Sequence, residues 1–258
     1  MKLGDAARSR EFRLEVFDSL GSTNDEAMAR GRAGDPGGLW IVARQQGRGR
    51  GRSGRAWSSP PGNLYASLLL AAPCRPAVAP QLGFVAGVAL HAAVEQATGL
   101  TPGRAALKWP NDLLLDRAKL AGILVEGATL AGGDLLVVIG IGVNAAHHPA
   151  DTPYPATDLG AKGLPVGVDP LFSALSDAMA AALRRWDAGA GFADIRRDWL
   201  KRAGGLGEPI LVRRPEGERR GVFVDLDGEG RLLLDEGGRR VAFEAGDVFL
   251  TNLQPADI

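Results

Sequence analysis

Four arginines and four glycines alternate between Gln45 and Trp57, in the segment QQGRGRGRSGRAW. The segment follows the apolar run Leu39 to Val42. Ordering it costs roughly 1–2 kcal/mol per residue in backbone entropy, and glycine loses the most. Arginine binds phosphates and carboxylates through paired hydrogen bonds, and successive backbone N–H groups also bind anions. We therefore expect a loop that closes over an anionic ligand, which offsets both the ordering cost and the repulsion between the arginines.

Three other interpretations of this segment compete with a lid. Residues 49–54 fit the dinucleotide fingerprint G-x-G-x-x-G, but Pro60 and Pro61 follow too soon for the helix that the fingerprint needs. An Arg-Gly arm that binds nucleic acid usually lies in a disordered tail, whereas this segment lies between two apolar runs. A solvated surface loop is the third interpretation. The lid is preferred, and the last two alternatives stay open.

Two lysines stand at the ends of apolar strands. Lys108 ends a strand that Pro110 stops, and Lys119 begins the apolar run Leu120 to Gly127. A lysine that is buried without a partner loses its charge, so Lys108 needs an anionic partner unless its side chain reaches the surface. An Asn111-Asp112 turn connects Lys108 to a return strand. Lys108 is therefore a candidate contact for an anionic group.

Alternate glycines end a buried strand. Leu135 to Val143 is a nearly continuous apolar run, which is typical of a central strand covered on both faces. Gly140 and Gly142 leave one face of this strand without side chains. A flat ligand could lie there, although such glycines can also mark close packing.

A polar run opens the first long helix. Thr23 is predicted as its N-cap, with Glu26 three residues later completing a capping box, and the helix extends to about Arg30. Capping does not require Ser22 or Asn24. Their side chains are therefore free to face a ligand.

Composition bounds the class of protein. The chain has 258 residues, 45% of them apolar and 23% charged, which is typical of globular proteins. A formal net charge of zero argues against bulk attraction to nucleic acid or membranes, yet residues 36–94 hold six arginines and no acidic residue. One cysteine, Cys74, excludes an internal disulfide and fits a reducing cytosol. No signal peptide or apolar run of membrane-spanning length is visible, so we expect a soluble, cytoplasmic protein without a membrane partner.

The remaining pattern predicts an α+β fold in two domains, residues 1–205 and 206–258. A loop rich in Pro and Gly covers 149–168, and His147-His148 lacks metal-ligand spacing, so we expect no metal site. After a glycine-rich linker at 204–207, turn signals separate five short strands that predict a small antiparallel barrel. The predicted strands lie at 14–17, 39–44, 63–71, 105–109, 113–115, 120–127, 135–143, 210–213, 221–226, 231–234, 239–243 and 247–250, and the predicted helices at 23–30, 80–98, 171–186 and 192–203.

Five motifs together resemble the biotin protein ligases, in the order of that family, over nearly the whole chain. They are Ser22-Thr23-Asn24, Gln46 with Gly49 to Trp57, Lys108 to Asp112, Lys119 to Leu124, and Gly140 to Asn144. The resemblance implies a catalytic domain similar to class II aminoacyl-tRNA synthetases and a Src-homology-3-like C-terminal barrel. It also implies two reactions: biotin and MgATP form biotinyl-5′-AMP and pyrophosphate, and a lysine of the biotin carboxyl carrier protein of acetyl-CoA carboxylase then takes the biotin.

The resemblance also implies a role for each matching residue. Lys108, Arg50 and Arg52 are the expected catalytic residues. The expected biotin contacts are Ser22, Thr23, Asn24, Gln46, Arg50, Gly51, Arg52, Lys108, Gly122, Gly140 and Gly142. The expected contacts with ATP or the adenylate are Arg50, Arg52, Arg55, Trp57, Lys108, Trp109, Asn111, Lys119 and Asn144.

Further expectations concern partners and rivals. Only 21 residues precede Ser22, too few for a helix-turn-helix module, so we expect no specific DNA binding. An exposed sheet edge could form a homodimer. A lipoate or octanoate ligase of the same superfamily remains an alternative, although no doubled Arg precedes a triple Gly here. An Arg/Gly-loop nucleic-acid-binding protein is the rival that is not an enzyme, and the zero net charge speaks against it.

Overall fold

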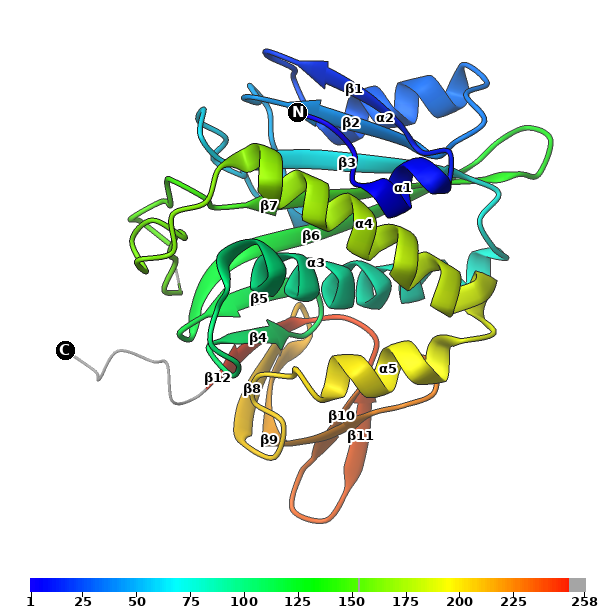
Figure 1. Ribbon diagram of the computed structural model, residues 1–258. Coiled ribbons are helices and arrows are strands. Elements are labelled where there is room, and N and C mark those ends of the chain that lie inside the picture. Colours follow the sequence, from blue (N-terminus) through cyan, green and yellow to red (C-terminus); the bar gives the residue numbers. More distant parts are fainter. Residues whose placement is uncertain (153, 251–258) are drawn as a thin grey trace.

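A computed structural model describes residues 1–152 and 154–250. Its centre is a seven-stranded mixed sheet (Figure 1). The strand order is β1-β2-β3-β7-β6-β5-β4, in which β1 and β2 are parallel and the other neighbours are antiparallel. The strands are β1 (Arg13–Phe17), β2 (Leu39–Ala43), β3 (Leu64–Ala71), β4 (Ala105–Lys108), β5 (Asp112–Leu115), β6 (Ala118–Thr129) and β7 (Leu135–Val143). The predicted strands in this half of the chain are confirmed, and Asp112 lies on β5 rather than in the turn.

Helices cover both faces of this sheet because its strands are apolar on both sides. On β7, Val137 and Ile139 pack into the large core with α3 (Leu82–Thr98) and α4 (Val168–Trp186). Leu136 and Val138 instead pack with Ala27 of α2 (Thr23–Arg32) in a smaller cluster. Successive strand residues point to opposite faces. Gly140 and Gly142 therefore face the side of α2.

The helix α3 is the core of the molecule. A 3₁₀ turn, η2 (Pro76–Gln81), precedes it, and Gly99 ends it in the left-handed region with φ of 63°. The stretch Pro76–Thr98 is long and apolar enough to cross a membrane, but most of α3 is buried between the sheet and its helical neighbours. The predicted helix at 80–98 is confirmed.

The predicted capping box of α2 is wrong. Ser22, not Thr23, is the N-cap, and its hydroxyl accepts a 3.4 Å hydrogen bond from the N–H of Asp25. The hydroxyl of Thr23 is bonded elsewhere, and Glu26 pairs with Arg30 one turn along the helix. Because both side chains have other partners, the helix opens with a single serine cap.

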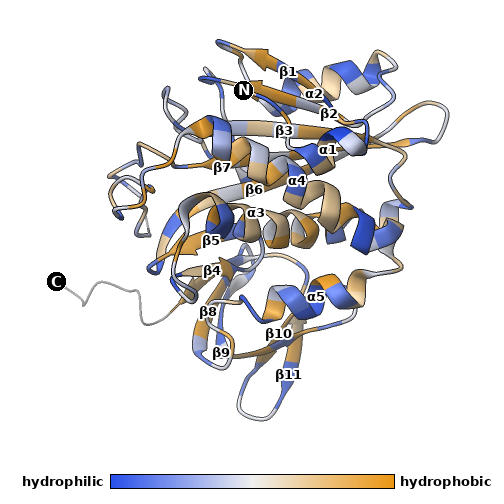
Figure 2. Ribbon diagram, viewed as in Figure 1, coloured by the Kyte–Doolittle hydropathy of each residue, from blue (hydrophilic) through white to orange (hydrophobic). Residues whose placement is uncertain are grey.

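A second, antiparallel sheet of five strands follows α5 (Phe192–Leu200). Its order is β11-β10-β9-β8-β12, and we call it the C-terminal sheet. The described ladders leave β11 and β12 as its edges, so they do not close the predicted barrel. Its strands carry both apolar and polar residues (Figure 2). The apolar Ile210, Val212 and Phe223 belong to the same core as the main sheet. The strands are β8 (Pro209–Arg214), β9 (Gly217–Leu226), β10 (Leu232–Asp235), β11 (Arg240–Phe243) and β12 (Asp247–Leu250); the short helix α1 (Asp5–Ser9) was not predicted.

Candidate active site

A cavity with about 200 Å³ of free space opens between the main sheet, the loop 44–63 and the C-terminal sheet. Its floor is built by strand register. Tyr65, Gly142 and Gly122 stand opposite one another on β3, β7 and β6, and all three line the cavity. Gly140 lies two residues before Gly142 on the same face. The cavity is therefore on the α2 side of the sheet, where β7 carries no side chains.

The glycines of this floor make room for the protein's own side chains. A Cβ atom at Gly140 would lie 2.1 Å from Oδ1 of Asn24, and one at Gly142 would lie 2.6 Å from Nε1 of Trp57. The surface left by the glycines is thus partly filled by Asn24 and Trp57. This agrees with the alternative that the glycines mark close packing. The Trp57 indole forms a wall of the cavity, and its buried N–H has no acceptor within the described residues.

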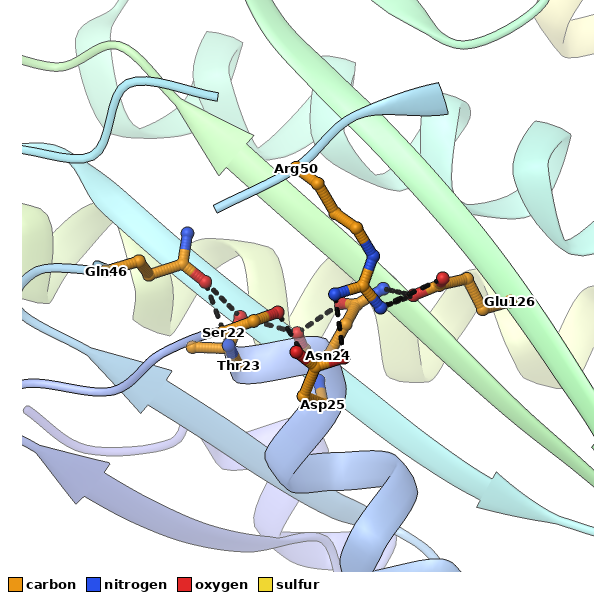
Figure 3. A network of polar contacts seen from close by, with 8 residues as sticks. Ser22, Thr23, Asn24, Asp25, Gln46, Arg50 and Glu126 are labelled. Carbon is orange, nitrogen blue, oxygen red and sulfur yellow. Dashed lines mark hydrogen bonds and ion pairs between the residues drawn. The ribbon is translucent and has the colours of Figure 1, made fainter. Parts of the chain in front are cut away.

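Ser22, Thr23, Asn24 and Gln46 meet at one end of the cavity (Figure 3). Oε1 of Gln46 accepts hydrogen bonds from the backbone N–H of Thr23 at 2.8 Å and from its hydroxyl at 3.1 Å. The hydroxyl of Ser67 on β3 lies 2.6 Å from Oδ1 of Asn24. The chain's own hydrogen bonds therefore hold the polar end of the cavity together.

The guanidinium of Arg50 is already paired. It contacts Oδ1 of Asp25 at 2.7 Å and both carboxylate oxygens of Glu126, at 3.0 and 2.9 Å (Figure 3). Glu126 also accepts a 2.7 Å hydrogen bond from Nδ2 of Asn24. Burial would lower the pKa of Arg50, but these carboxylates hold it above its usual value. The side chain of Arg50 therefore anchors the loop rather than offering a free cation.

Lys108 and Lys119 meet at a single buried carboxylate. The Nζ atoms of Lys108 and Lys119 lie 3.0 and 2.7 Å from the two oxygens of Asp112. Burial alone would raise the pKa of Asp112, and the two lysines hold it below its usual value. Burial would lower the pKa of Lys119, and Asp112 holds it above its usual value. The anionic partner that the sequence requires for Lys108 is thus supplied by the opposite position of its own hairpin.

An aromatic ring covers both ammonium groups. The Nζ atoms of Lys108 and Lys119 lie 5.3 and 5.2 Å from the ring centroid of Tyr154. Backbone bonds hold the following segment against β6, because Lys119 donates its N–H to Pro155 O at 2.7 Å and Thr157 donates to Lys119 O at 2.9 Å. This packing places two cations under an electron-rich face at the wall of the cavity.

The arginine loop folds back on itself and reaches the C-terminal sheet. Its neck is a bridge between Arg50 and Ala56, and its tip is a 3₁₀ turn, η1 (Arg52–Gly54), with Ser53 at φ of 55°. Nη1 of Arg52 donates weakly to Asn111 at 3.4 Å and to Gly246 O at 3.3 Å. No carboxylate of the described chain forms an ion pair with Arg52. The expectation that only a ligand offsets the crowded arginines is therefore wrong, since the chain's own carboxylates pair with two of the four.

The structure brings most of the expected residues together and leaves two outside. Trp109 is buried in the core, and its indole N–H donates to Gly230 O at 3.2 Å. Asn144 is buried beyond the floor, with its side-chain amide bonded to Thr157 O at 3.1 Å. Neither side chain lines the cavity. The expected residues that line it are Ser22, Thr23, Asn24, Gln46, Arg50, Gly51, Arg52, Arg55, Trp57, Lys108, Asn111, Lys119, Gly122, Gly140 and Gly142.

Several residues of the site were not predicted. Asp112 and Tyr154 complete the lysine cluster, and Glu126 anchors the loop. Asp247 to Phe249 bring the C-terminal sheet to the mouth of the cavity. Hairpin register could have paired Asp112 with Lys108, because the two residues flank a three-residue turn. The contacts of Asp247 carry no local signal, since they join positions nearly 200 residues apart.

Comparison with known proteins places this geometry in a class. Residues 17–144 match the model of the biotin/lipoate A/B protein ligase family, a class of protein ligases. Residues 205–251 match the biotin protein ligase C terminal domain. A biotin–[acetyl-CoA-carboxylase] ligase of Paracoccus denitrificans is 41% identical over 238 residues, which is 88% of this chain and 96% of the relative. The chain belongs to the biotin protein ligase family.

Two further comparisons support this assignment. The biotin–[acetyl-CoA-carboxylase] ligase of Mycobacterium tuberculosis is 34% identical, over 91% of this chain and 88% of the relative. The biotin protein ligase of Aquifex aeolicus in complex with biotin and ATP superposes with a TM-score of 0.77 at 25% identity, over 92% of this chain and 97% of that one. The mixed sheet, its helices and the C-terminal sheet are therefore the fold of this family.

Proposed function

We propose that this ligase activates biotin with ATP to biotinyl-5′-AMP and transfers the biotin to a lysine of the biotin carboxyl carrier protein of acetyl-CoA carboxylase. The observation that carries the proposal is one cavity with a polar end and a cationic end. Ser22, Thr23, Asn24 and Gln46 form the polar end, and Lys108, Lys119 and Arg52 form the cationic end. A neutral ring system with a carboxylate tail fits between them.

The first reaction needs charge and positioning. The biotin carboxylate attacks the α-phosphorus of ATP, and pyrophosphate leaves. Lys108 and Lys119 are the expected partners of the carboxylate and the α-phosphate, and Arg52 of the phosphate oxygens. In-line attack on phosphorus requires alignment and stabilisation of developing negative charge rather than a protein nucleophile. The second reaction is attack by the carrier lysine on the carbonyl carbon of the mixed anhydride, with AMP as the leaving group.

Magnesium belongs to the proposal as part of MgATP. Among residues 1–152 and 154–250, no group of three His, Cys, Asp or Glu side chains could hold a metal ion, and Asp112 is taken by two lysines. The ion would therefore arrive with the triphosphate and neutralise the charge of the leaving pyrophosphate.

The geometry of the site supports the two rival functions less well. An arginine arm that binds nucleic acid should present its guanidinium groups outward, whereas Arg50 points at Glu126 and Arg55 at Asp247. A lipoate ligase shares the adenylate chemistry, so the two functions differ in which acid the enzyme activates. Incubation with ATP and either biotin or lipoate, followed by measurement of pyrophosphate release, separates the rivals. Release with biotin alone supports the proposal, and release only with lipoate contradicts it.

Broader parts of the proposal follow from the resemblance. The catalytic domain is proposed to be similar to class II aminoacyl-tRNA synthetases, the C-terminal sheet to be of the Src-homology-3 type, and the site of action to be the cytoplasm. The zero net charge argues against specific binding to DNA and against a membrane partner. A homodimer would use β1, since Ala203 bridges to Leu107 on β4 at the other edge and Val16 on β1 is 43% exposed.

A further inference from the structure

The C-terminal sheet touches the arginine loop at its tip. Nη2 of Arg55 lies 2.7 Å from Oδ1 of Asp247, and Nη1 of Arg52 lies 3.3 Å from Gly246 O. Asp247 begins β12, where the ladder to β8 fixes its backbone opposite Arg213. The loop therefore has two anchors. The outer contact joins it to the C-terminal sheet, and the inner anchor is the pairing of Arg50 with Asp25 and Glu126.

The outer and inner contacts hold different parts of the loop. The inner anchor sits at the neck of the loop, beside the bridge from Arg50 to Ala56. The outer contact holds the tip, and it joins two parts of the chain that are almost 200 residues apart. Nζ of Lys108 also donates to Val248 O at 3.2 Å, so the same strand end touches a lysine of the site. Within residues 1–152 and 154–250, residues 52–55 are tied to other parts of the chain by the ion pair of Arg55 and the weak hydrogen bonds of Arg52.

We propose that Asp247 is a positioning residue that latches the loop through Arg55 and so sets how long the activated intermediate stays in the cavity. The inference rests on the proposed function, because it concerns the adenylate formed there. A mixed anhydride reacts with water and with any exposed amine, so a closed loop between the two reactions protects it. Asp247 also lies close enough to Arg52 to offset part of the repulsion that Arg52 feels from Arg55.

The test measures the release of preformed adenylate. The enzyme is loaded with radiolabelled biotin and ATP, freed of excess substrate, and chased with unlabelled biotin; biotin transfer to an unrelated protein, serum albumin, is followed in parallel. Asp247→Ala should raise the release rate and albumin labelling about two- to five-fold, the scale of a half-exposed ion pair. Asp247→Glu, which keeps the carboxylate, should stay near the wild-type rate.

A matched control shows whether faster release comes from the lost contact with the loop or from weaker packing of the C-terminal sheet against the rest of the protein. Asp225 of β9 pairs with Arg196 of α5 at 2.6 Å and is 42% exposed, against 38% for Asp247. This pair joins α5 to the C-terminal sheet, and neither of its residues lines the cavity. Asp225→Ala should release the adenylate at the wild-type rate. An equal rise in Asp225→Ala and Asp247→Ala would overturn the latch.

A double-mutant cycle tests the route through Arg55. In an Arg55→Gln background, Asp247→Ala should have no further effect on release, because the pair is already lost. The same fold-increase in both backgrounds, or no increase in either single variant, rejects the proposal. If Asp247→Ala melts at a much lower temperature, Asp247→Asn carries the release test, because it removes the charge that pairs with Arg55 and keeps the size of the side chain. A wild-type enzyme that forms no adenylate would instead refute the proposed function.

Discussion

Oδ1 of Asp112 lies 2.7 Å from Nζ of Lys119, and the other oxygen of the same carboxylate lies 3.0 Å from Nζ of Lys108. One buried acid thus holds two cations at the wall of the cavity. Without it, two ammonium groups would share a buried site, which is unfavourable for both. Asp112 therefore sets the charge of the lysines as well as their position.

Replacing Asp112 should change how adenylation depends on pH. In Asp112→Asn the main influence that raises the pKa of Lys119 is lost, while burial, which lowers it, remains. Lys119 should then lose its proton at a lower pH than in the wild type. We expect the rate of adenylate formation to fall with rising pH earlier in the variant, measured by pyrophosphate release. Identical alkaline limbs in both enzymes would show that Lys119 does not act through its charge.

The same carboxylate should contribute to acid stability. The folded-state pKa of Asp112 is depressed, so its contribution is present above the unfolded value of about 3.9 and is lost as the pH falls below that value toward the folded pKa. Wild type should lose unfolding free energy below about pH 4 more steeply than Asp112→Asn. Urea unfolding at several acidic pH values measures this. Parallel curves would mean that the ion pairs do not stabilise the fold.

Removing Lys108 should damage the chemistry. Lys108→Ala is expected to form adenylate at least about 100-fold more slowly, the usual scale for one preorganised charge contact. Lys162→Ala is the control, because Lys162 pairs with Asp116 outside the cavity. Single-turnover measurements on folded protein give the rate of adenylate formation in both variants. Near-normal adenylation by Lys108→Ala would remove this lysine from the catalytic residues.

Much of the site could be predicted because its residues follow strand ends and turns. Lys108 and Gly142 lie where apolar runs end and Lys119 lies where one begins, and the sequence shows both kinds of boundary. The burial of Trp109 could not be predicted, because an aromatic side chain fits both a binding wall and a core, and only tertiary packing decides between them. The pairing of Arg55 with Asp247 depends on how the C-terminal sheet docks, and no local pattern encodes that.

The glycine floor gives a prediction about packing. In Gly142→Ala the new methyl group would lie 2.6 Å from Nε1 of Trp57, so the indole ring must move. Overpacking of this kind costs about 1–3 kcal/mol, and displacing the wall should weaken biotin binding about tenfold or more. Gly127→Ala on β6 is the control, since its nearest contact would be an ordinary 3.6 Å. Calorimetric titration with biotin that finds equal affinity in both variants contradicts the assignment of Trp57 to the binding wall.

The loop at 47–55 should become more ordered when ligands bind. Ordering nine residues costs about 9–18 kcal/mol, and the chain's own ion pairs are partly exposed, at about 0.2–1 kcal/mol each, so they offset only part of it. Hydrogen exchange across 47–55 should therefore slow when biotin and ATP are added. Equal protection with and without ligands would mean that the loop is a fixed turn.

Variants of Arg52 and Arg50 should differ in whether they weaken ligand-driven closure of the loop or the stability of the fold. Arg52 forms no ion pair with a carboxylate among residues 1–152 and 154–250, so Arg52→Ala should leave the melting temperature unchanged. It should still weaken biotin binding, and its adenylate should escape and label lysines of unrelated proteins. Arg50→Ala removes contacts with Asp25 and Glu126, so it should lower the melting temperature, by about 2–4 °C for each kcal/mol lost. Thermal unfolding and biotin titration of the two variants test this division, and it is wrong if Arg52→Ala melts earlier than Arg50→Ala while binding biotin normally.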